Sequence, residues 1–284
     1  MMAATLSSRL RGATLFLAVL SAASTWAQTQ QNRMVDIGGC RLHIAESGSG
    51  HPVVVFESGM GEPLGTWSNV QPAIARFART VSYDRAGLGQ SDPSPRPRTM
   101  EALATDLHSV LHAAKVPPPY ILVGHSLGGA IVQVFAHNYP KEVAGLVLVD
   151  PAERRLEERL HSRMAADEWS ERAKLIASFR PKTPATLVAE MDAEWSASNA
   201  ATVMDDISLP RVPIVLFTGT QKNPDFPGNP LEQDLKLELH HTRLAKIPGA
   251  KHVLVPNSRH YIQNDAPQLV IDAVHDIVTH RPSK

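Results

Sequence analysis

Apolar residues in this chain gather in short continuous runs that alternate with longer amphipathic segments. Short apolar runs are typical of strands buried on both faces, and apolar residues three or four apart are typical of helices that pack on a sheet. Their alternation predicts a mainly parallel sheet covered by helices on both faces. Strands are expected at residues 35–37, 41–45, 52–56, 81–83, 120–123, 143–149, 214–217 and 252–255.

Helices are expected between these runs. Thr99 is a suitable N-cap, because the apolar residues that follow it have helical spacing. Further helices are expected at residues 127–138, 231–245 and 267–279.

Residues 151–210 interrupt the alternation. This segment has no convincing strand pattern, and it is charged, helix-prone and dotted with large apolar residues such as Trp169 and Trp195. Because it follows one strand and precedes the next, we predict a helical cap over the strand ends; ordinary surface helices are the alternative. The core would then comprise residues 34–150 and 211–284.

The N-terminus has the pattern of a secretory signal peptide. Arg9 and Arg11 precede an apolar stretch, and small residues lead to Ala27. The stretch is short for a membrane span of about 20 residues, which favours cleavage after Ala27 over an uncleaved anchor. We therefore expect residues 1–27 to be removed, and the mature chain to be periplasmic or secreted without a stable membrane anchor.

The amino-acid composition is typical of a globular protein with one large domain. The 284 residues are 43% hydrophobic with a formal net charge of +0, which suits one large domain with an insertion. Balanced charge gives no electrostatic reason to bind nucleic acid. The single cysteine, Cys40, excludes an intrachain disulfide.

The most informative motif follows the apolar run at residues 120–123. The sequence Gly-His-Ser-Leu-Gly at residues 124–128 lies between an expected strand and an expected helix. This context predicts a sharp turn with Ser126 at its apex, because glycines allow strand and helix to approach closely. A serine hydroxyl is a poor nucleophile unless it lies beside a base and beside donors to an oxyanion. We interpret Ser126 as a nucleophile.

Four segments together resemble the α/β-hydrolase superfamily, over essentially all of residues 34–280. The resemblance implies an α/β-hydrolase fold with a mostly parallel eight-stranded sheet, a helical cap between the sixth and seventh strands, and no cofactor. The similarity is greatest to serine esterases and related hydrolases of carboxylic esters or carbon–carbon bonds. The matching segments are Ser-Gly-Met-Gly at 58–61, Asp-Arg-Ala-Gly-Leu-Gly-Gln-Ser at 84–91, Gly-His-Ser-Leu-Gly-Gly at 124–129 and Ser-Arg-His-Tyr-Ile at 258–262.

The resemblance also implies the partners of the nucleophile. His260 lies in the loop expected to hold the general base, in the chain order Ser, Asp, His. Lys222 stands where many relatives carry the triad acid. Two acids remain, Asp150 at the end of the sixth strand and Asp225 beyond the seventh, and we favour Asp150. Either would fix the histidine tautomer and stabilise the imidazolium.

The implied oxyanion hole uses the backbone N–H groups of Leu127 and Met60. Leu127 begins the helix after the nucleophile, whose positive dipole end favours an anion. Many relatives carry His-Gly before the second donor, whereas this chain has Ser58-Gly59.

A metal site is not expected. His108 and His112 are four residues apart on one expected helix, but no nearby acid or metal-binding motif accompanies them.

The sequence therefore predicts a serine hydrolase that cleaves a carboxylic ester or lactone through an acyl-enzyme. Large apolar residues in the cap indicate a small-molecule substrate that is partly apolar. One alternative uses the same residues for cofactor-free perhydrolase or lyase chemistry. The other is a receptor that has lost catalysis and binds a small ligand in the pocket under the cap.

Overall fold

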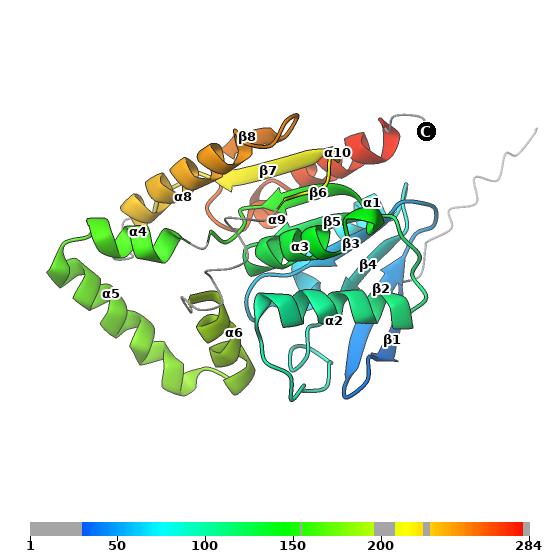
Figure 1. The fold of residues 1–284 in the computed structure, drawn as a ribbon, viewed down its shortest axis with the longest axis horizontal. Helices are drawn as coiled ribbons and strands as arrows, with labels where there is room; N and C mark the ends of the chain where they lie inside the picture. The colour runs from blue at the N-terminus through cyan, green and yellow to red at the C-terminus, as the bar shows by residue number, and fades with distance from the viewer. Residues whose placement is uncertain (1–29, 154, 196–207, 224–227, 281–284) are drawn as a thin grey trace, which may run out of the picture.

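The computed structural model describes residues 30–153, 155–195, 208–223 and 228–280. Its centre is one eight-stranded sheet in the order β1-β2-β4-β3-β5-β6-β7-β8 (Figure 1). The pairs β1–β2 and β2–β4 are antiparallel, and every other neighbouring pair is parallel, so the predicted sheet is confirmed. The strands are β1 (Gln31–Asp36), β2 (Arg41–Ser47), β3 (Val53–Glu57), β4 (Thr80–Tyr83), β5 (Tyr120–His125), β6 (Val143–Val149), β7 (Ile214–Gly219) and β8 (Lys251–Val255).

Helices cover both faces of this sheet, with α2 and α3 on one face and α1 and α10 on the other. The hydroxyl of Thr99 accepts a hydrogen bond from Ala102 N, as expected of an N-cap. The helices are α1 (Gln71–Ile74), α2 (Met100–Ala113), α3 (Leu127–Asn138), α4 (Leu156–Arg163), α5 (Ala166–Phe179), α6 (Ala185–Trp195), α8 (Asn229–Leu244), α9 (Ile262–Asp265) and α10 (Pro267–Thr279), with 3-10 turns η1 (Leu64–Trp67), η2 (Pro140–Glu142) and η3 (Arg180–Lys182).

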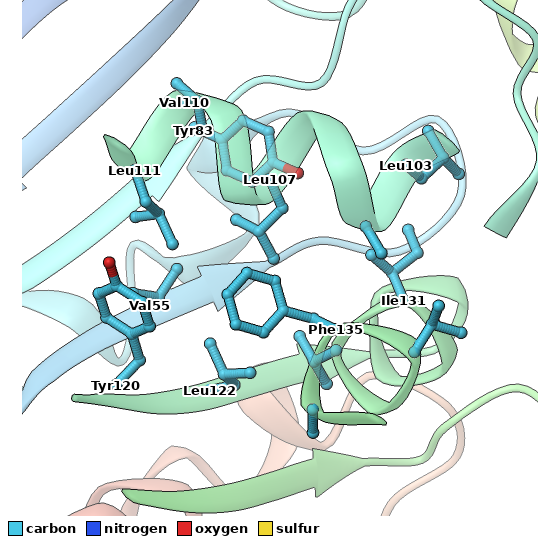
Figure 2. Packing of buried hydrophobic residues seen from close by; sticks show 14 of the residues in the cluster. Val55, Tyr83, Leu103, Leu107, Val110, Leu111, Tyr120, Leu122, Ile131 and Phe135 are labelled. Atoms are coloured by element: carbon cyan, nitrogen blue, oxygen red, sulfur yellow. The ribbon is translucent and has the colours of Figure 1, made fainter. Parts of the chain in front are cut away.

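Alternate residues of the central strands enter two separate core layers. In β3, Val55 faces the layer formed with α2 and α3, while its neighbour Val54 faces the opposite layer. Figure 2 shows Leu107 of α2 and Phe135 of α3 meeting in the first layer. Each large apolar side chain buried in this way contributes about 1.5–3 kcal/mol, so the sheet is a rigid support for the loops at its edges.

The strand register brings distant residues to one edge. β5 and β6 pair through His125 and Val149, and β6 and β7 pair through Val149 and Phe217. Because these strands are parallel, the residues that follow them lie at the same edge, where ligands bind in open parallel sheets. Ser126 and Asp150 both follow directly.

Helices α4, α5 and α6 lie between β6 and β7 in the chain, and no strand occurs in the described part of this segment, 155–195. Figure 1 shows α5 lying away from the sheet and α6 lying closer to it, beside one end of α2. The predicted signal peptide at 1–27 falls outside the described residues. Within the described residues, no helix has the length and apolar character needed to cross a membrane.

Candidate active site

The turn between β5 and α3 holds Ser126 in a strained conformation. Its φ of 51° and ψ of −121° lie in a region that residues with a Cβ rarely adopt. Ser126 N donates a hydrogen bond to Val149 O at 3.2 Å, and Ser126 O accepts one from Ala152 N at 2.9 Å. The turn is therefore fastened to the end of β6, and its strain is held by the surrounding backbone.

Glycines make this turn sterically feasible. A Cβ on Gly124 would lie 2.5 Å from Gly128 O, and a Cβ on Gly128 would lie 2.2 Å from Glu57 O. Both separations are far below van der Waals contact, and both obstacles are backbone atoms. Strand, helix and β3 can meet here only because these positions lack side chains.

The structure brings His260 and Asp150 together. His260 lies between β8 and α9, and its Nδ1 is 2.7 Å from Asp150 Oδ2. Asp150 is fully buried with a φ of 45°, and its Oδ1 accepts a hydrogen bond from Gly219 N at 3.1 Å. The alternative acid, Asp225, falls outside the described residues. Lys222 forms an exposed ion pair with Asp234 at 2.8 Å.

Asp150 also contacts a buried lysine, Lys236. The sequence analysis did not predict this lysine. Lys236 of α8 donates from Nζ to Asp150 Oδ2 at 2.6 Å, and only 7% of its side chain is exposed. Burial works to raise the pKa of Asp150, but Lys236 and then His260 lower that pKa well below its usual range. Asp150 is therefore a carboxylate at neutral pH, with one oxygen shared between the lysine and the histidine.

His125 lies between the histidine loop and the loop after β3. It is fully buried; its Nε2 is 3.0 Å from His260 O, and its Nδ1 is 3.1 Å from Glu62 Oε2. Its ring centroid is 4.6 Å from that of His260. His125 thus helps to fix the backbone of His260.

The loop after β3 leaves the Met60 N–H available. On either side of it, Gly59 N donates to Glu62 Oε2 at 3.0 Å and Gly61 N donates to Glu190 Oε2 at 2.9 Å. Among the described residues, neither Met60 N nor Leu127 N donates a hydrogen bond to the protein. These are the two predicted oxyanion donors.

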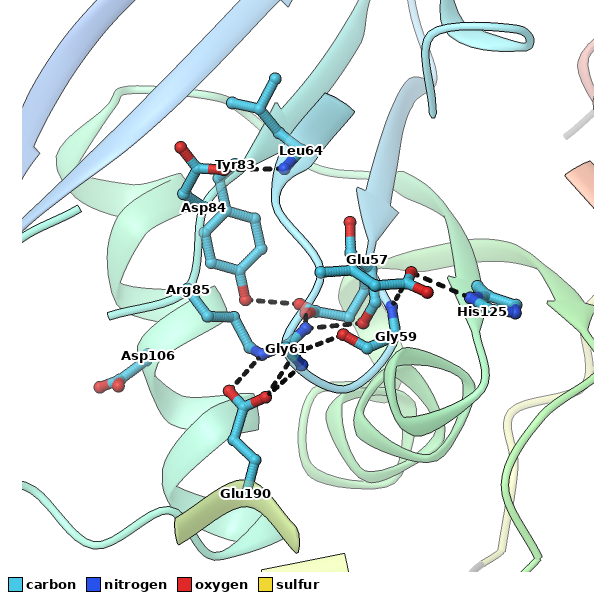
Figure 3. A network of polar contacts seen from close by, with 12 residues as sticks. Glu57, Gly59, Gly61, Leu64, Tyr83, Asp84, Arg85, Asp106, His125 and Glu190 are labelled. Carbon is cyan, nitrogen blue, oxygen red and sulfur yellow. Dashed lines mark hydrogen bonds and ion pairs between the residues drawn. The ribbon is translucent and has the colours of Figure 1, made fainter. Parts of the chain in front are cut away.

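The side chain of Arg85 fixes the loop after β3 through hydrogen bonds (Figure 3). Its buried guanidinium donates to Ser58 O and to Gly59 O, each at 2.6 Å. The same group forms ion pairs with Glu57 at 2.8 Å and with Glu190 at 2.9 Å. Tyr83 completes the cluster through a hydrogen bond from its hydroxyl to Glu57. One side chain therefore fixes two consecutive carbonyls directly before Met60.

Glu190 connects helix α6 to the same loop. It comes from α6, is fully buried, and accepts a further hydrogen bond from Arg98 at 2.8 Å. Leu187, one turn earlier in α6, packs closely against Gly61. A Cβ on Gly61 would lie only 2.7 Å from Leu187 Cδ1. Burial works to raise the pKa of Glu190, but Arg85 and then Arg98 and Gly61 N lower it to about 2.

The segment at 84–91 supports the neighbouring loops through the carboxylate of Asp84. Asp84 accepts hydrogen bonds from Leu64 N at 2.7 Å and Gln90 N at 3.0 Å, and contacts His43 Nδ1 at 2.8 Å. Gly89, with a φ of 51°, lets the loop close over this carboxylate.

Comparison with known proteins identifies the family. A family model described as "alpha/beta hydrolase fold" matches residues 52–179. The chain belongs to the α/β-hydrolase superfamily. It is an enzyme of that superfamily, a hydrolase, and its eight-stranded sheet is the one that the sequence resemblance implied.

Individual members of the superfamily show how far the similarity extends. The uncharacterized protein YqjL of Bacillus subtilis is 28% identical over 242 residues, which is 85% of this chain and 89% of YqjL. The putative carbamate hydrolase RutD of Klebsiella pneumoniae is 37% identical over 142 residues, covering 46% of this chain and 53% of RutD. The crystal structure of carboxylesterase CesB from Bacillus subtilis superimposes with a TM-score of 0.63 at 19% identity, covering 90% of this chain and 94% of CesB; this last likeness concerns the fold alone.

The first prediction concerns the pH dependence of the Glu190 cluster. The pKa of Glu190 is about 2 in the folded chain and about 4.3 in an unfolded one, so ionised Glu190 stabilises the fold fully above about pH 4.3. That contribution is lost as pH falls towards about 2. We expect Glu190→Gln to lower the free energy of unfolding by on the order of 3 kcal/mol at neutral pH, with a deficit that shrinks below about pH 4.3.

Urea unfolding of the wild type and the variant at a series of pH values measures this deficit. Glu171→Gln is the matched control, because Glu171 of the adjacent helix α5 forms only an exposed pair with Lys174. A deficit that does not change between neutral and acidic pH would contradict the assigned charge state.

The second prediction concerns Lys236. Lys236→Met leaves the buried Asp150 carboxylate without its cation, and breaking a buried pair in this way costs about 3–5 kcal/mol. Lys222→Met removes an exposed pair of the same type and should cost at most about 1 kcal/mol. Chemical denaturation at neutral pH measures the free energy of unfolding of both variants. Equal losses in the two variants would show that the buried Lys236 pair stabilises the fold no more than the exposed Lys222 pair does. Adding Asp150→Asn to Lys236→Met should recover part of the loss, because no unpaired charge then remains buried.

Proposed function

We propose that this chain is a serine hydrolase that cleaves a carboxylic ester or lactone through an acyl-enzyme on Ser126. The observation that carries the proposal is that one edge of the sheet holds both a serine at positive φ and the hydrogen-bonded pair His260–Asp150. A nucleophile and a base oriented by a third group are the parts that acyl transfer requires.

The tautomer of His260 follows from its partner. Asp150 is a carboxylate and can only accept, so Nδ1 of His260 carries the proton and donates it to Oδ2. Nε2 is then the lone-pair nitrogen that takes the Ser126 hydroxyl proton during attack. It returns that proton to the leaving alcohol, and a water molecule repeats the sequence to release the acid.

The oxyanion would bind to the N–H groups of Met60 and Leu127. Leu127 N lies at the N-terminus of α3, where the helix dipole adds to the attraction. Arg85 and Glu190 fix the backbone on either side of Met60, so this donor is oriented before the charge develops. Preorganised donors of this kind are typically worth about 10²–10³ in rate each.

The name of one similar protein supports an acyl substrate. RutD is described as a putative carbamate hydrolase, and a carbamate, like a carboxylic ester, contains a carbonyl group. Apolar residues of the cap segment, such as Leu187 beside the oxyanion loop, support a substrate with an apolar part. The pattern of residues 1–27 supports export to the periplasm or the medium.

The third prediction tests the nucleophile. The wild type should hydrolyse members of a p-nitrophenyl ester series from acetyl to long acyl chains, with an optimum that reports the size of the acyl site. Ser126→Ala should lower kcat by about 10⁴-fold or more and should abolish labelling by a fluorophosphonate. Turnover that survives in Ser126→Ala would overturn the proposal. Labelling without turnover of any ester would redirect the search to lactones, amides and carbon–carbon bonds.

The fourth prediction separates the two acids. Asp150→Asn should lower kcat by about 10⁴-fold, because the amide favours the wrong histidine tautomer, while Asp225→Asn should leave kcat within a few fold. Circular dichroism and thermal unfolding check that each variant is folded. The reverse order of losses would assign the role to Asp225.

A further inference from the structure

A second group of ligating side chains lies far from Ser126, at the other end of the strands. His108 and His112 are four residues apart on α2 and therefore share one face of that helix. Glu142 ends η2, directly before β6. The Nε2 atoms of both histidines point to the same carboxylate oxygen, Glu142 Oε1, at 3.2 Å and 3.9 Å.

The fold supplies the acid that the local sequence lacked. Glu142 is 34 residues from His108 along the chain, so no motif search around the histidine pair could find it. It reaches them because α3 packs against α2 and then returns to the sheet through η2. Within the described residues, no other group of three His, Cys, Asp or Glu side chains brings its ligand atoms this close together.

The group is held in place by its surroundings. The ring of His108 stacks on Tyr139, with centroids 3.8 Å apart and planes 7° from parallel, and also packs near Phe135. Glu142 N donates a hydrogen bond to Tyr139 O at 3.0 Å, which fixes the backbone of the acid. His112 is 60% exposed, so the group is open to solvent on one side.

One polar atom of the group is unsatisfied. Glu142 Oε2 is buried and has no hydrogen-bond partner among the described residues. A buried carboxylate oxygen without a partner is costly, because nothing replaces the water that it loses. A cation that both oxygens of this carboxylate coordinate would remove that cost.

We propose that His108, His112 and Glu142 form a binding site for a divalent transition metal, with Zn²⁺ as its best occupant. Imidazole nitrogen and carboxylate oxygen bind Zn²⁺ at about 2.0–2.2 Å, so two donors on a tetrahedral ion lie about 3.4 Å apart. The separations of 3.2 Å and 3.9 Å need only small side-chain rotations to match. Nitrogen donors disfavour Mg²⁺ and Ca²⁺, which prefer oxygen.

The proposed site is structural. Tyr120, at the start of β5, pairs with Val143, the residue after Glu142, and Ser126 follows the end of the same strand. A strand of this length spans about 20 Å, so the ion would not take part in chemistry at Ser126. It would join α2 to the turn that leads into β6, and so stabilise the fold by binding only the native state.

Binding of Zn²⁺ to tag-free, EDTA-dialysed protein tests the proposal by isothermal titration calorimetry and thermal unfolding. We expect one ion per chain and a rise in Tm of about 3–6 °C at saturating ZnCl₂. His112→Ala and Glu142→Gln should each weaken binding by at least about tenfold and abolish the rise in Tm. His112 is exposed, so its variant should fold normally even if substitution at Glu142 does not.

His280→Ala, at the exposed C-terminal end of α10, is the control and should bind Zn²⁺ as the wild type does. Visible absorption of the Co²⁺ form should show tetrahedral ligand-field bands that His112→Ala lacks. Unchanged affinity in both His112→Ala and Glu142→Gln, or less than one ion per chain in the wild type, would overturn the assignment. An equal rise in Tm with Mg²⁺ or Ca²⁺ would overturn the choice of a transition metal.

Discussion

The buried guanidinium of Arg85 is the contact on which the rest of the site depends. It binds the carbonyls of Ser58 and Gly59, and it lies between the carboxylates of Glu57 and Glu190. A buried ion pair by itself is weak evidence for stability, because desolvation offsets much of the attraction. Here the cluster fixes a geometry: the planar fork sets the positions of two carbonyls at once, which a lysine could not do.

Glu190 makes helix α6 part of this geometry. The same carboxylate accepts from Arg85 and from Gly61 N, so the position of α6 and the conformation of the loop before η1 depend on one another. Displacing α6 would leave Arg85 with one carboxylate and Gly61 N without its acceptor. In the proposed mechanism, the contacts of α6 therefore help to orient the Met60 N–H before the charge develops.

The sequence predicts the sheet well because buried strands and amphipathic helices leave periodic patterns. The bounds of α3, β6 and α10 agree with the expected ranges. The short helices α1 and α9 have four residues each, too few for a helical period to appear. Glu190 and Lys236 could not be found, because a charged residue in an amphipathic helix resembles a solvated one until the packing around it is known.

The acid of the proposed triad is another residue that the sequence alone could not identify with certainty of position. Asp150 and Asp225 follow neighbouring strands, and either could be placed near the base from sequence alone. The structure adds contacts that favour Asp150: His260, Lys236 and Gly219 N all converge on it. Such convergence depends on the register of parallel strands and on a helix that returns across the sheet. The proposed acyl chemistry at the carboxyl ends and the proposed metal site near the amino ends are thus separated by the length of these strands.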